Sequence, residues 1–257
     1  LDKTIFTFPT ICSNCSAGTG ISVLYKEDGS FDRYGYPDVP AHVFINTSVI
    51  AKAPKEYFWA GIGDGISKAP EVEHAVAAAV ERGVELPHTA VLGAAIAASS
   101  KDAFYKYGEQ GIKDVENGTV SKAIEEVALD IVVSTGYASN LVNQDDFYYN
   151  SCHAHAFYNA TTAIKKEKEP LHGQVVAFGV MVLYAYFNEL EELKKVITFN
   201  KKLGLPVSLA EIGLKASDAE KITEFAMQTN EYKHTPFDKE KYIEAIKLAD
   251  KMGSEKI

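Results

Sequence analysis

The chain has 257 residues, with 26 Lys and Arg against 35 Asp and Glu and a net charge of −9. Nucleic acids and anionic membrane surfaces bind basic faces, so this balance argues against both as partners. A hydrophobic fraction of 46% supports a packed core, and no apolar run is long enough to span a bilayer. The three cysteines (Cys12, Cys15 and Cys152) are an odd number, which argues against a disulfide scaffold and favours the reducing cytoplasm.

The first 50 residues are predicted to be rich in strands. Residues 21–25 and 31–36 are β-prone runs, and Asp28-Gly29 between them predicts a hairpin. Residues 42–46 predict another buried strand. Cys12 and Cys15 have CxxC spacing, but a zinc or redox site of this kind normally needs a second pair.

From Pro54 onward, apolar residues recur at helical spacing. Pro87, Gly118, Pro170 and Gly204 predict breaks, and Ser217 and Asp238 are candidate N-caps. Residues 165–169 are a charge run that predicts a solvated loop. The pattern predicts helices at residues 54–82, 89–114, 119–138, 152–166, 173–187, 190–203, 217–229 and 239–252.

Three residues far apart in the sequence could form a metal site. Asp64 lies in Gly-Ile-Gly-Asp-Gly, His155 follows His153 by two positions, and His172 opens His-Gly-Gln-Val-Val. One carboxylate and two imidazoles suit Zn²⁺ or Fe²⁺ with an open coordination position. Taken alone, Asp64 is more often a turn or N-cap residue than a ligand. Positions two apart on a helix face different ways, so only one of the two histidines can reach a metal easily.

The phrases around these residues resemble the glycerol dehydrogenases of the metal-dependent (iron-containing) alcohol dehydrogenase family. The resemblance implies that Asp64, His155 and His172 are the metal ligands and also the catalytic and substrate-contacting residues. His153 is then expected to be a satisfied structural histidine. The matching phrases run through residues 9–13, 21–25, 27–32, 49–54, 60–65, 155–156, 172–180 and 205–209.

Two departures from the family pattern affect the metal. Lys68 stands where iron-type relatives carry a His as a fourth ligand, and a protonated Lys has no lone pair for a metal. This favours zinc over iron. Tyr158 occupies a position where many relatives carry another His, and neutral Tyr is a poor zinc ligand.

The resemblance also assigns the turn near the N-terminus to the cofactor and the substrate. Cys15 is aligned with an Asp that contacts the polyol in glycerol dehydrogenases, so a neutral thiol replaces a carboxylate at the substrate position. We therefore expect poor turnover of glycerol itself. The positions aligned with cofactor contacts are Thr10, Ser13, Thr19, Ile21 and Tyr25.

The resemblance implies a dehydroquinate synthase-like fold that is mainly α-helical. Residues 1–50 would be the C-terminal remnant of an α/β dinucleotide-binding domain, and residues 51–257 a helical metal-binding domain. The chain contains no Gly-Gly-Gly phosphate-binding turn and is expected to be the C-terminal two-thirds of such an enzyme.

The implied function is metal-dependent, NAD- or NADP-linked oxidation of a small alcohol or polyol by a cytoplasmic homo-oligomer. Two alternatives remain open. One is a fold-mate with a phosphate-bearing substrate, such as a glycerol-1-phosphate dehydrogenase-like enzyme or a cyclase. The other is a truncated, non-catalytic helical domain that binds metal.

Overall fold

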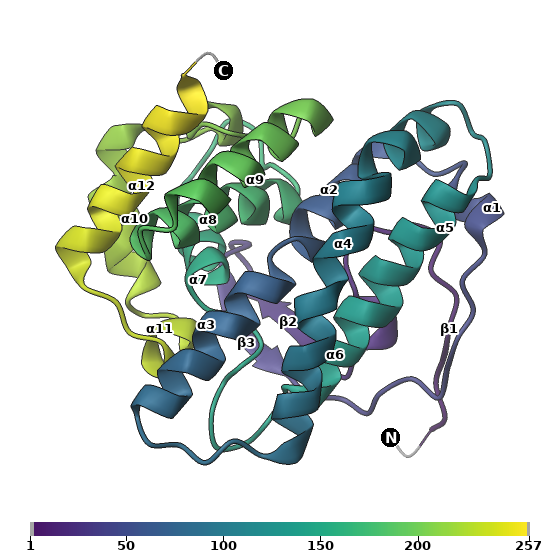
Figure 1. The fold of residues 1–257 in the computed structure, drawn as a ribbon, viewed down its shortest axis with the longest axis horizontal. Coiled ribbons are helices and arrows are strands. Elements are labelled where there is room, and N and C mark those ends of the chain that lie inside the picture. Colours follow the sequence, from purple (N-terminus) through teal and green to yellow (C-terminus); the bar gives the residue numbers. More distant parts are fainter. Residues whose placement is uncertain (1–2, 256–257) are drawn as a thin grey trace.

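The structure is a computed structural model that describes residues 3–255. Short strands in the N-terminal part are followed by helices to the C-terminal end (Figure 1). The strands are β1 (Phe6–Thr7), β2 (Ser22–Tyr25), β3 (Phe31–Gly35) and β4 (His42–Val43). The helices are α1 (Thr47–Ile50), α2 (Lys55–Gly65), α3 (Lys68–Glu81), α4 (His88–Glu116), α5 (Lys122–Leu129), α6 (Thr135–Leu141), α7 (His153–Thr161), α8 (His172–Tyr186), α9 (Leu190–Leu203), α10 (Ala219–Ala226), α11 (Asn230–His234) and α12 (Lys239–Ser254).

Strands β2 and β3 form the antiparallel hairpin that Asp28-Gly29 predicts. The Lys26 amide donates to the Ser30 carbonyl at 2.9 Å, and Gly29 has a φ of 82°. Glycine adopts this left-handed conformation without a steric penalty. The prediction of a hairpin is therefore confirmed.

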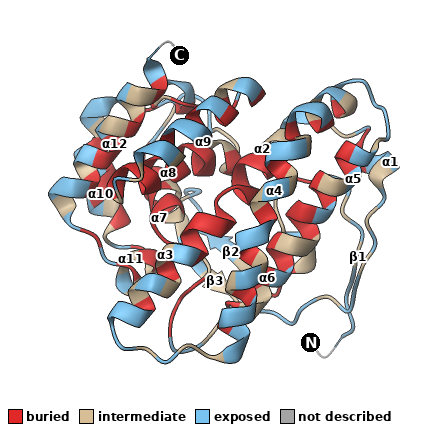
Figure 2. Cartoon of the chain, in the orientation of Figure 1, coloured by how far each residue is buried: buried red, intermediate tan, exposed pale blue. Residues whose placement is uncertain are grey.

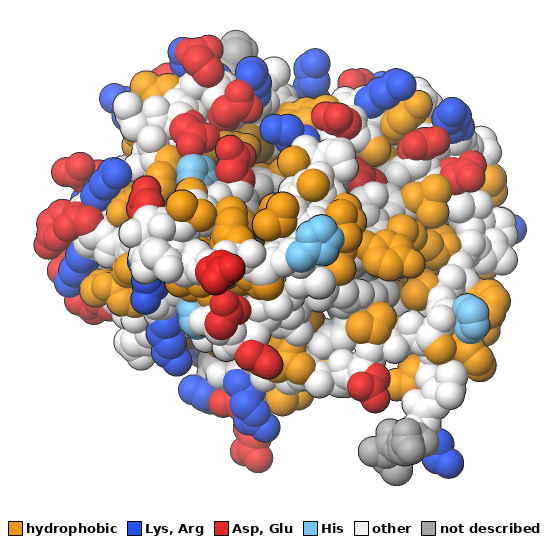
Figure 3. Space-filling model, turned by 60° about the horizontal axis from the view of Figure 1, so that its bottom comes forward, with side chains coloured by type: hydrophobic (Ala, Val, Ile, Leu, Met, Phe, Trp, Pro, Cys, Tyr) orange, Lys and Arg blue, Asp and Glu red, His pale blue; other side chains and the backbone are white. Residues whose placement is uncertain are grey.

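The strand expected at residues 42–46 is shorter and less buried than predicted. Only His42 and Val43 pair, in parallel with β1. Phe44 is half-exposed and stacks on the exposed Phe8, with 4.7 Å between ring centroids. Parallel strands are normally covered on both faces. Val43 packs against the core, but no further strand extends this pair among residues 3–255, and hydrophobic side chains reach the surface near the N-terminal end (Figure 3). The expectation of a buried strand is wrong here.

The helix predicted at residues 54–82 is in fact two helices, α2 and α3. The Asp64 carbonyl accepts hydrogen bonds from the Ser67 amide at 3.1 Å and from the Ser67 hydroxyl at 2.7 Å. These bonds tighten the last turn of α2 and let the chain change direction before α3 begins. Pro70 adds to the break, because it has no N–H to donate to the Ile66 carbonyl and its ring clashes with that carbonyl.

Other helix boundaries also differ from the predictions. The helix expected at 119–138 starts later, passes through a π-helical segment (Asp130–Ser134) and continues as α6 to Leu141. The helix expected at 152–166 ends at Thr161, where hydroxyls bond back to the main chain. Helices α1 and α11 were not predicted.

The two predicted N-caps have different outcomes. Asp238 caps α12, because its carboxylate accepts from the Lys241 amide at 2.8 Å. Ser217 does not cap a helix; it lies inside a short 3₁₀ turn (Ala216–Asp218). Asp218 precedes α10, but its carboxylate accepts from the Lys215 amide at 2.9 Å, before the 3₁₀ turn, and makes no capping bond to α10.

Helix α8 is the centre of the core. It is buried over nearly its whole length, and α2, α7, α9 and α12 pack around it (Figures 1 and 2). A helix that is apolar on all sides must be enclosed in this way. The expected fold class, mainly α-helical with a small strand-containing part, is confirmed. None of the described helices is both long and apolar enough to cross a membrane.

Asp130, at the start of the π-helical segment, is an acid buried without an ion-pair partner among the described residues. It is 5% exposed, and its Oδ2 has no hydrogen-bond partner. Burial raises the pKa of this carboxyl to about 7; a Ser134 hydrogen bond opposes the shift, and the nearby carboxylates of Asp102 and Glu126 add to it. The folded protein therefore keeps a proton that the unfolded chain releases near pH 4.

We expect the stability contributed by Asp130 to fall as the pH rises from about 4 to about 7, because the folded state binds more protons in this window. Asp130→Asn should raise the free energy of unfolding at about pH 8 by about 1–3 kcal/mol, the cost of a buried unpaired polar group. At about pH 4 the two proteins should be nearly equal. Urea unfolding at both pH values is the measurement, with the exposed Asp145→Asn as control. The same pH dependence in Asp130→Asn and the unmodified protein would contradict the expectation.

Candidate metal centre

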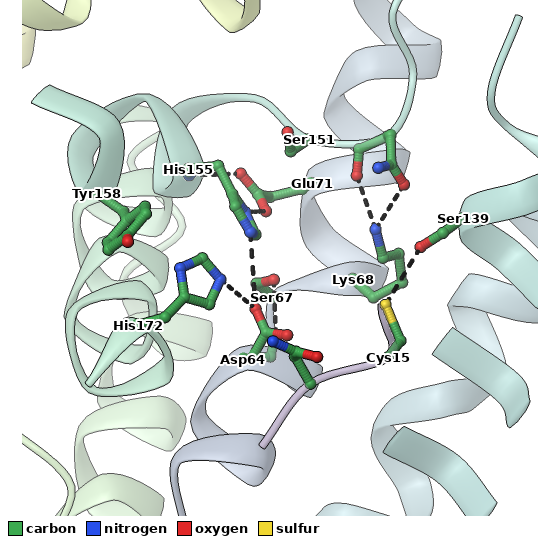
Figure 4. A network of polar contacts seen from close by, with 12 residues as sticks. Cys15, Asp64, Ser67, Lys68, Glu71, Ser139, Ser151, His155, Tyr158 and His172 are labelled. Atoms are coloured by element: carbon green, nitrogen blue, oxygen red, sulfur yellow. Dashed lines mark hydrogen bonds and ion pairs between the residues drawn. The ribbon is translucent and has the colours of Figure 1, made fainter. Parts of the chain in front are cut away.

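Three side chains from three helices converge on one point. Asp64 comes from α2, His155 from α7, and His172 is the first residue of α8 (Figure 4). Asp64 Oδ1 lies 3.0 Å from His172 Nε2 and 3.6 Å from His155 Nε2. One ligand atom from each residue lies within 4.8 Å of the others. This donor set of one oxygen and two nitrogens fits a divalent cation such as Zn²⁺.

Glycines make this convergence possible. A Cβ on Gly173 would lie 1.8 Å from the Ala60 carbonyl oxygen, and a Cβ on Gly63 would lie 2.4 Å from the Gly173 carbonyl oxygen. Helices α2 and α8 therefore approach more closely than any side chain would permit at these two positions. The approach brings Asp64, next to Gly63, against His172, next to Gly173.

Glu71 on α3 holds His155 from behind. Its Oε2 lies 2.5 Å from His155 Nδ1, and its Oε1 accepts from the main-chain amides of Cys152 and His155, both at 2.9 Å. Glu71 is completely buried. Because the Glu71 carboxylate binds the Nδ1 side of the ring, Nε2 is directed toward Asp64. Such carboxylate–histidine pairs orient metal-binding imidazoles.

The charges at the site stabilise one another. Burial alone would raise the pKa of Asp64, but attraction to His172 and contacts with both imidazoles hold that pKa well below its usual range. Burial would lower the pKa of His155, but Glu71 and Asp64 raise it to about 10. A bound divalent cation would replace the proton on Nε2, because only a deprotonated imidazole nitrogen can be a ligand.

His153 points away from this centre, as its helical spacing from His155 predicts. It is buried among Tyr186, Phe187 and Tyr242. Both of its ring nitrogens lack a hydrogen-bond partner, and burial lowers its pKa to about 3. The residue is thus structural, but the expectation that it is satisfied by hydrogen bonds is wrong. The surrounding rings give the imidazole apolar contacts, and the Tyr242 hydroxyl donates to the main-chain carbonyl of His153 at 2.8 Å.

Asp64, His155 and His172 line a small cavity of about 100 Å³. Three of the residues assigned to substrate or cofactor also line it: Cys15, Thr19 and Ile21. Thr10 is exposed, and neither Thr10 nor Ser13 is among the lining residues. Tyr25 lies at the edge of the cavity, where its hydroxyl is 3.2 Å from that of Tyr158.

Part of the cavity wall is held by the buried Glu231 of α11. Its Oε1 accepts hydrogen bonds from the Tyr34 hydroxyl at 2.8 Å, the Ser151 hydroxyl at 3.0 Å and the Asn159 amide at 3.2 Å. All three donors line the cavity. One carboxylate therefore sets the positions of three polar side chains, and a rigid wall of this kind favours defined ligand geometry.

The sequence analysis does not predict two buried carboxylates that support the site, Glu71 and Glu231. For Glu71 a signal exists, because Asp64, Lys68 and Glu71 are spaced by four and three residues, as on one helix face. The break between α2 and α3 weakens that argument. Glu231 contacts Tyr34 from a position 197 residues away, and no local pattern indicates such a contact.

The chain matches no protein-family model. It is 30% identical to a glycerol dehydrogenase from Thermotoga maritima over 98% of this chain and 70% of the relative. It is 29% identical to hydroxycarboxylate dehydrogenase A from Escherichia coli over 86% of this chain and 59% of that protein.

Solved structures show the same fold. A probable glycerol dehydrogenase from Sinorhizobium meliloti superposes with a TM-score of 0.86 at 24% identity, over 97% of this chain and 70% of that one. The glycerol dehydrogenase from Schizosaccharomyces pombe gives 0.82 at 26% identity, over 97% and 64%. The chain therefore spans between 59% and 70% of the length of these relatives.

Removal of one proposed ligand should release the metal without unfolding the protein. We expect His172→Ala to lower zinc affinity by more than about a hundredfold, because removal of even a supporting partner costs ten- to a hundredfold. Elemental analysis and calorimetry after zinc reconstitution measure this, and circular dichroism follows the fold. The exposed His88→Ala is the control. Equal loss of helical structure in His172→Ala would instead indicate a structural histidine.

Glu71→Gln should weaken the metal site through His155. The amide cannot accept the Nδ1 proton at the position of Oε2, so zinc affinity should fall roughly ten- to a hundredfold. Glu73→Gln, an exposed change on the same helix, is the matched control. Competition for zinc with a coloured chelator measures both affinities. Unchanged affinity in Glu71→Gln would show that the imidazole needs no support.

Proposed function

The chain belongs to the glycerol dehydrogenase family, and we propose on this basis that it takes part in metal-dependent, NAD- or NADP-linked oxidation of a small alcohol or polyol. The observation that carries the proposal is the convergence of Asp64, His155 and His172 at one cavity. The names of the relatives include glycerol and hydroxycarboxylate dehydrogenases. What these names share is oxidation of a hydroxyl group, so the reaction is better supported than the substrate.

Asp64, His155 and His172 would hold the metal, and Glu71 would keep the His155 ring in place. A divalent metal at this position supplies Lewis acidity, which lowers the pKa of an alcohol oxygen. A nicotinamide cofactor supplies the hydride acceptor. Thr19 and Ile21, which line the cavity, would border the nicotinamide, and the hydroxyls held by Glu231 would orient the substrate.

Zinc is proposed over iron because Lys68 offers no fourth ligand. Its Nζ donates to the Asn150 carbonyl at 2.9 Å and to the Asn150 side-chain oxygen at 2.7 Å. A protonated amine has no lone pair for a metal. The division into residues 1–50 and 51–257, the homo-oligomer and the cytoplasmic location stay predictions.

The test is an assay of zinc-loaded protein with NAD and NADP against a panel of diols, polyols, simple alcohols and small hydroxycarboxylates. We expect zinc-dependent reduction of the cofactor. A protein that binds zinc at this site yet oxidises none of the panel would support the alternative, a non-catalytic metal-binding domain. A protein that oxidises alcohols equally well without metal would contradict the proposed role of the three ligands.

The same panel tests the role of Cys15. A carboxylate accepts strongly from substrate hydroxyls and a thiol only weakly. We expect poor use of glycerol by the unmodified protein and an improvement of roughly ten- to a hundredfold in Cys15→Asp, the value of a charge-assisted hydrogen bond. Cys15→Ser, which stays neutral, is the control. Efficient glycerol oxidation that Cys15→Asp does not improve would defeat this expectation.

A further inference from the structure

Lys68 is a buried ammonium group on the wall of the metal-site cavity. It is 5% exposed and lines the cavity together with Asp64 and Cys15. Two of its three N–H donors are used by the oxygens of Asn150. Both acceptors are neutral. A buried charge is costly unless an opposite charge or a full set of hydrogen bonds compensates it, so Lys68 has the capacity for an anionic partner.

The nearby carboxylates do not fill this role in the described part of the chain. Asp64 contacts His155 and His172, and Glu71 contacts His155 and two main-chain amides. No described carboxylate lies within ion-pair distance of the Lys68 ammonium; its polar contacts are both with Asn150. The positive charge is therefore not neutralised from the protein side.

Cys15 does not supply a negative charge either. Its sulfur lies 3.8 Å from the Ser139 hydroxyl, and burial raises the pKa of its thiol despite the attraction of Lys68. The thiol is thus neutral near pH 7. Figure 4 shows Cys15 and Lys68 side by side, with the metal-ligand cluster next to them. This part of the cavity therefore presents the Lys68 ammonium beside the neutral Cys15 thiol.

We propose that Lys68 binds the carboxylate of the substrate, so that the preferred substrates are small 2-hydroxy acids and, in reverse, 2-oxo acids. This inference rests on the proposed function, because the hydroxyl would be oxidised at the metal centre. Lys68 and the three ligands line the same small cavity. A carboxylate on the carbon next to the hydroxyl-bearing carbon lets one short molecule reach both.

The oxidation balances without a further reactant. The bond between C2 and hydrogen breaks as a hydride passes to the oxidised nicotinamide, and the hydroxyl proton passes to solvent. C2 and its oxygen become a carbonyl, while the carboxylate on Lys68 is unchanged. The substrate loses two electrons and the cofactor gains them.

A carboxylate fits the site better than a phosphate. Among the described lining residues Lys68 is accompanied by no arginine and no second lysine. Phosphate groups carry more charge and are usually bound by several donors or by a planar guanidinium. One ammonium with a single free N–H suits a singly charged group.

The test compares two ligands with the same carbon skeleton, lactate and propane-1,2-diol. Calorimetry on zinc-loaded protein at fixed ionic strength gives both affinities, with each enantiomer. We expect lactate to bind roughly ten- to a hundredfold tighter than the diol, the value of a charge-assisted contact. In Lys68→Met this preference should disappear.

Lys166→Met is the matched control. Lys166 is also buried and also donates to a main-chain carbonyl, at 2.7 Å, but it pairs with Glu169 outside the metal-site cavity. The preference for lactate should persist in this variant. Lys68→Gln, which keeps a donor for Asn150, replaces Lys68→Met if the latter does not fold, and should lose the preference as well.

Several outcomes would overturn the inference. They are equal affinities in the unmodified protein, a preference for lactate that survives in the Lys68 variants, or glycerol 1-phosphate binding tighter than lactate. Elemental analysis of the same samples separates the two proposals. If the samples bind no zinc, the proposed function is contradicted. If they bind zinc but show no preference for lactate that depends on Lys68, only this inference is contradicted.

Discussion

The close approach of α2 and α8 is the constraint on which the rest of the site depends. Main chain meets main chain at Gly63 and Gly173, where no Cβ could fit. Two ligands from opposite helices thereby become neighbours without long, mobile side chains. Because α8 is also the centre of the hydrophobic core, the packing that stabilises the fold is the packing that positions the ligands. A methyl group at either glycine would disturb both.

Around this contact, three polar side chains act as supports. Glu71 orients His155, Asn150 holds Lys68, and Glu231 accepts from Tyr34, Ser151 and Asn159. Glu71 and Glu231 are buried, where hydrogen bonds are electrostatically stronger than in water. These supports hold the cavity wall in a defined geometry. The charge of the wall then depends on Lys68, which has no carboxylate partner among the described residues.

The sequence predicts the fold class and most helices, because caps, glycines and apolar spacing are local signals. Asp238 and Gly204 act where their residue types indicate. The break at Ser67 and the π-helical segment after Leu129 depend on hydrogen bonds that spacing alone does not reveal. The residues around Asp64, His155 and His172 indicate these three side chains from the sequence. Glu71 has a local signal in its spacing from Asp64 and Lys68, whereas Glu231 contacts Tyr34 from 197 positions away and has none.

The cavity also has a consequence for how the protein reaches its native state. Its walls join residues 124 positions apart at Cys15 and Ser139, 133 at Tyr25 and Tyr158, and 197 at Tyr34 and Glu231. Closure of such long loops costs conformational entropy, and this cost comes before the contacts at the cavity can stabilise the chain. The hydrogen bonds within each helix, by contrast, join residues only four positions apart. During refolding we therefore expect local helical structure to form before the walls of this cavity come together.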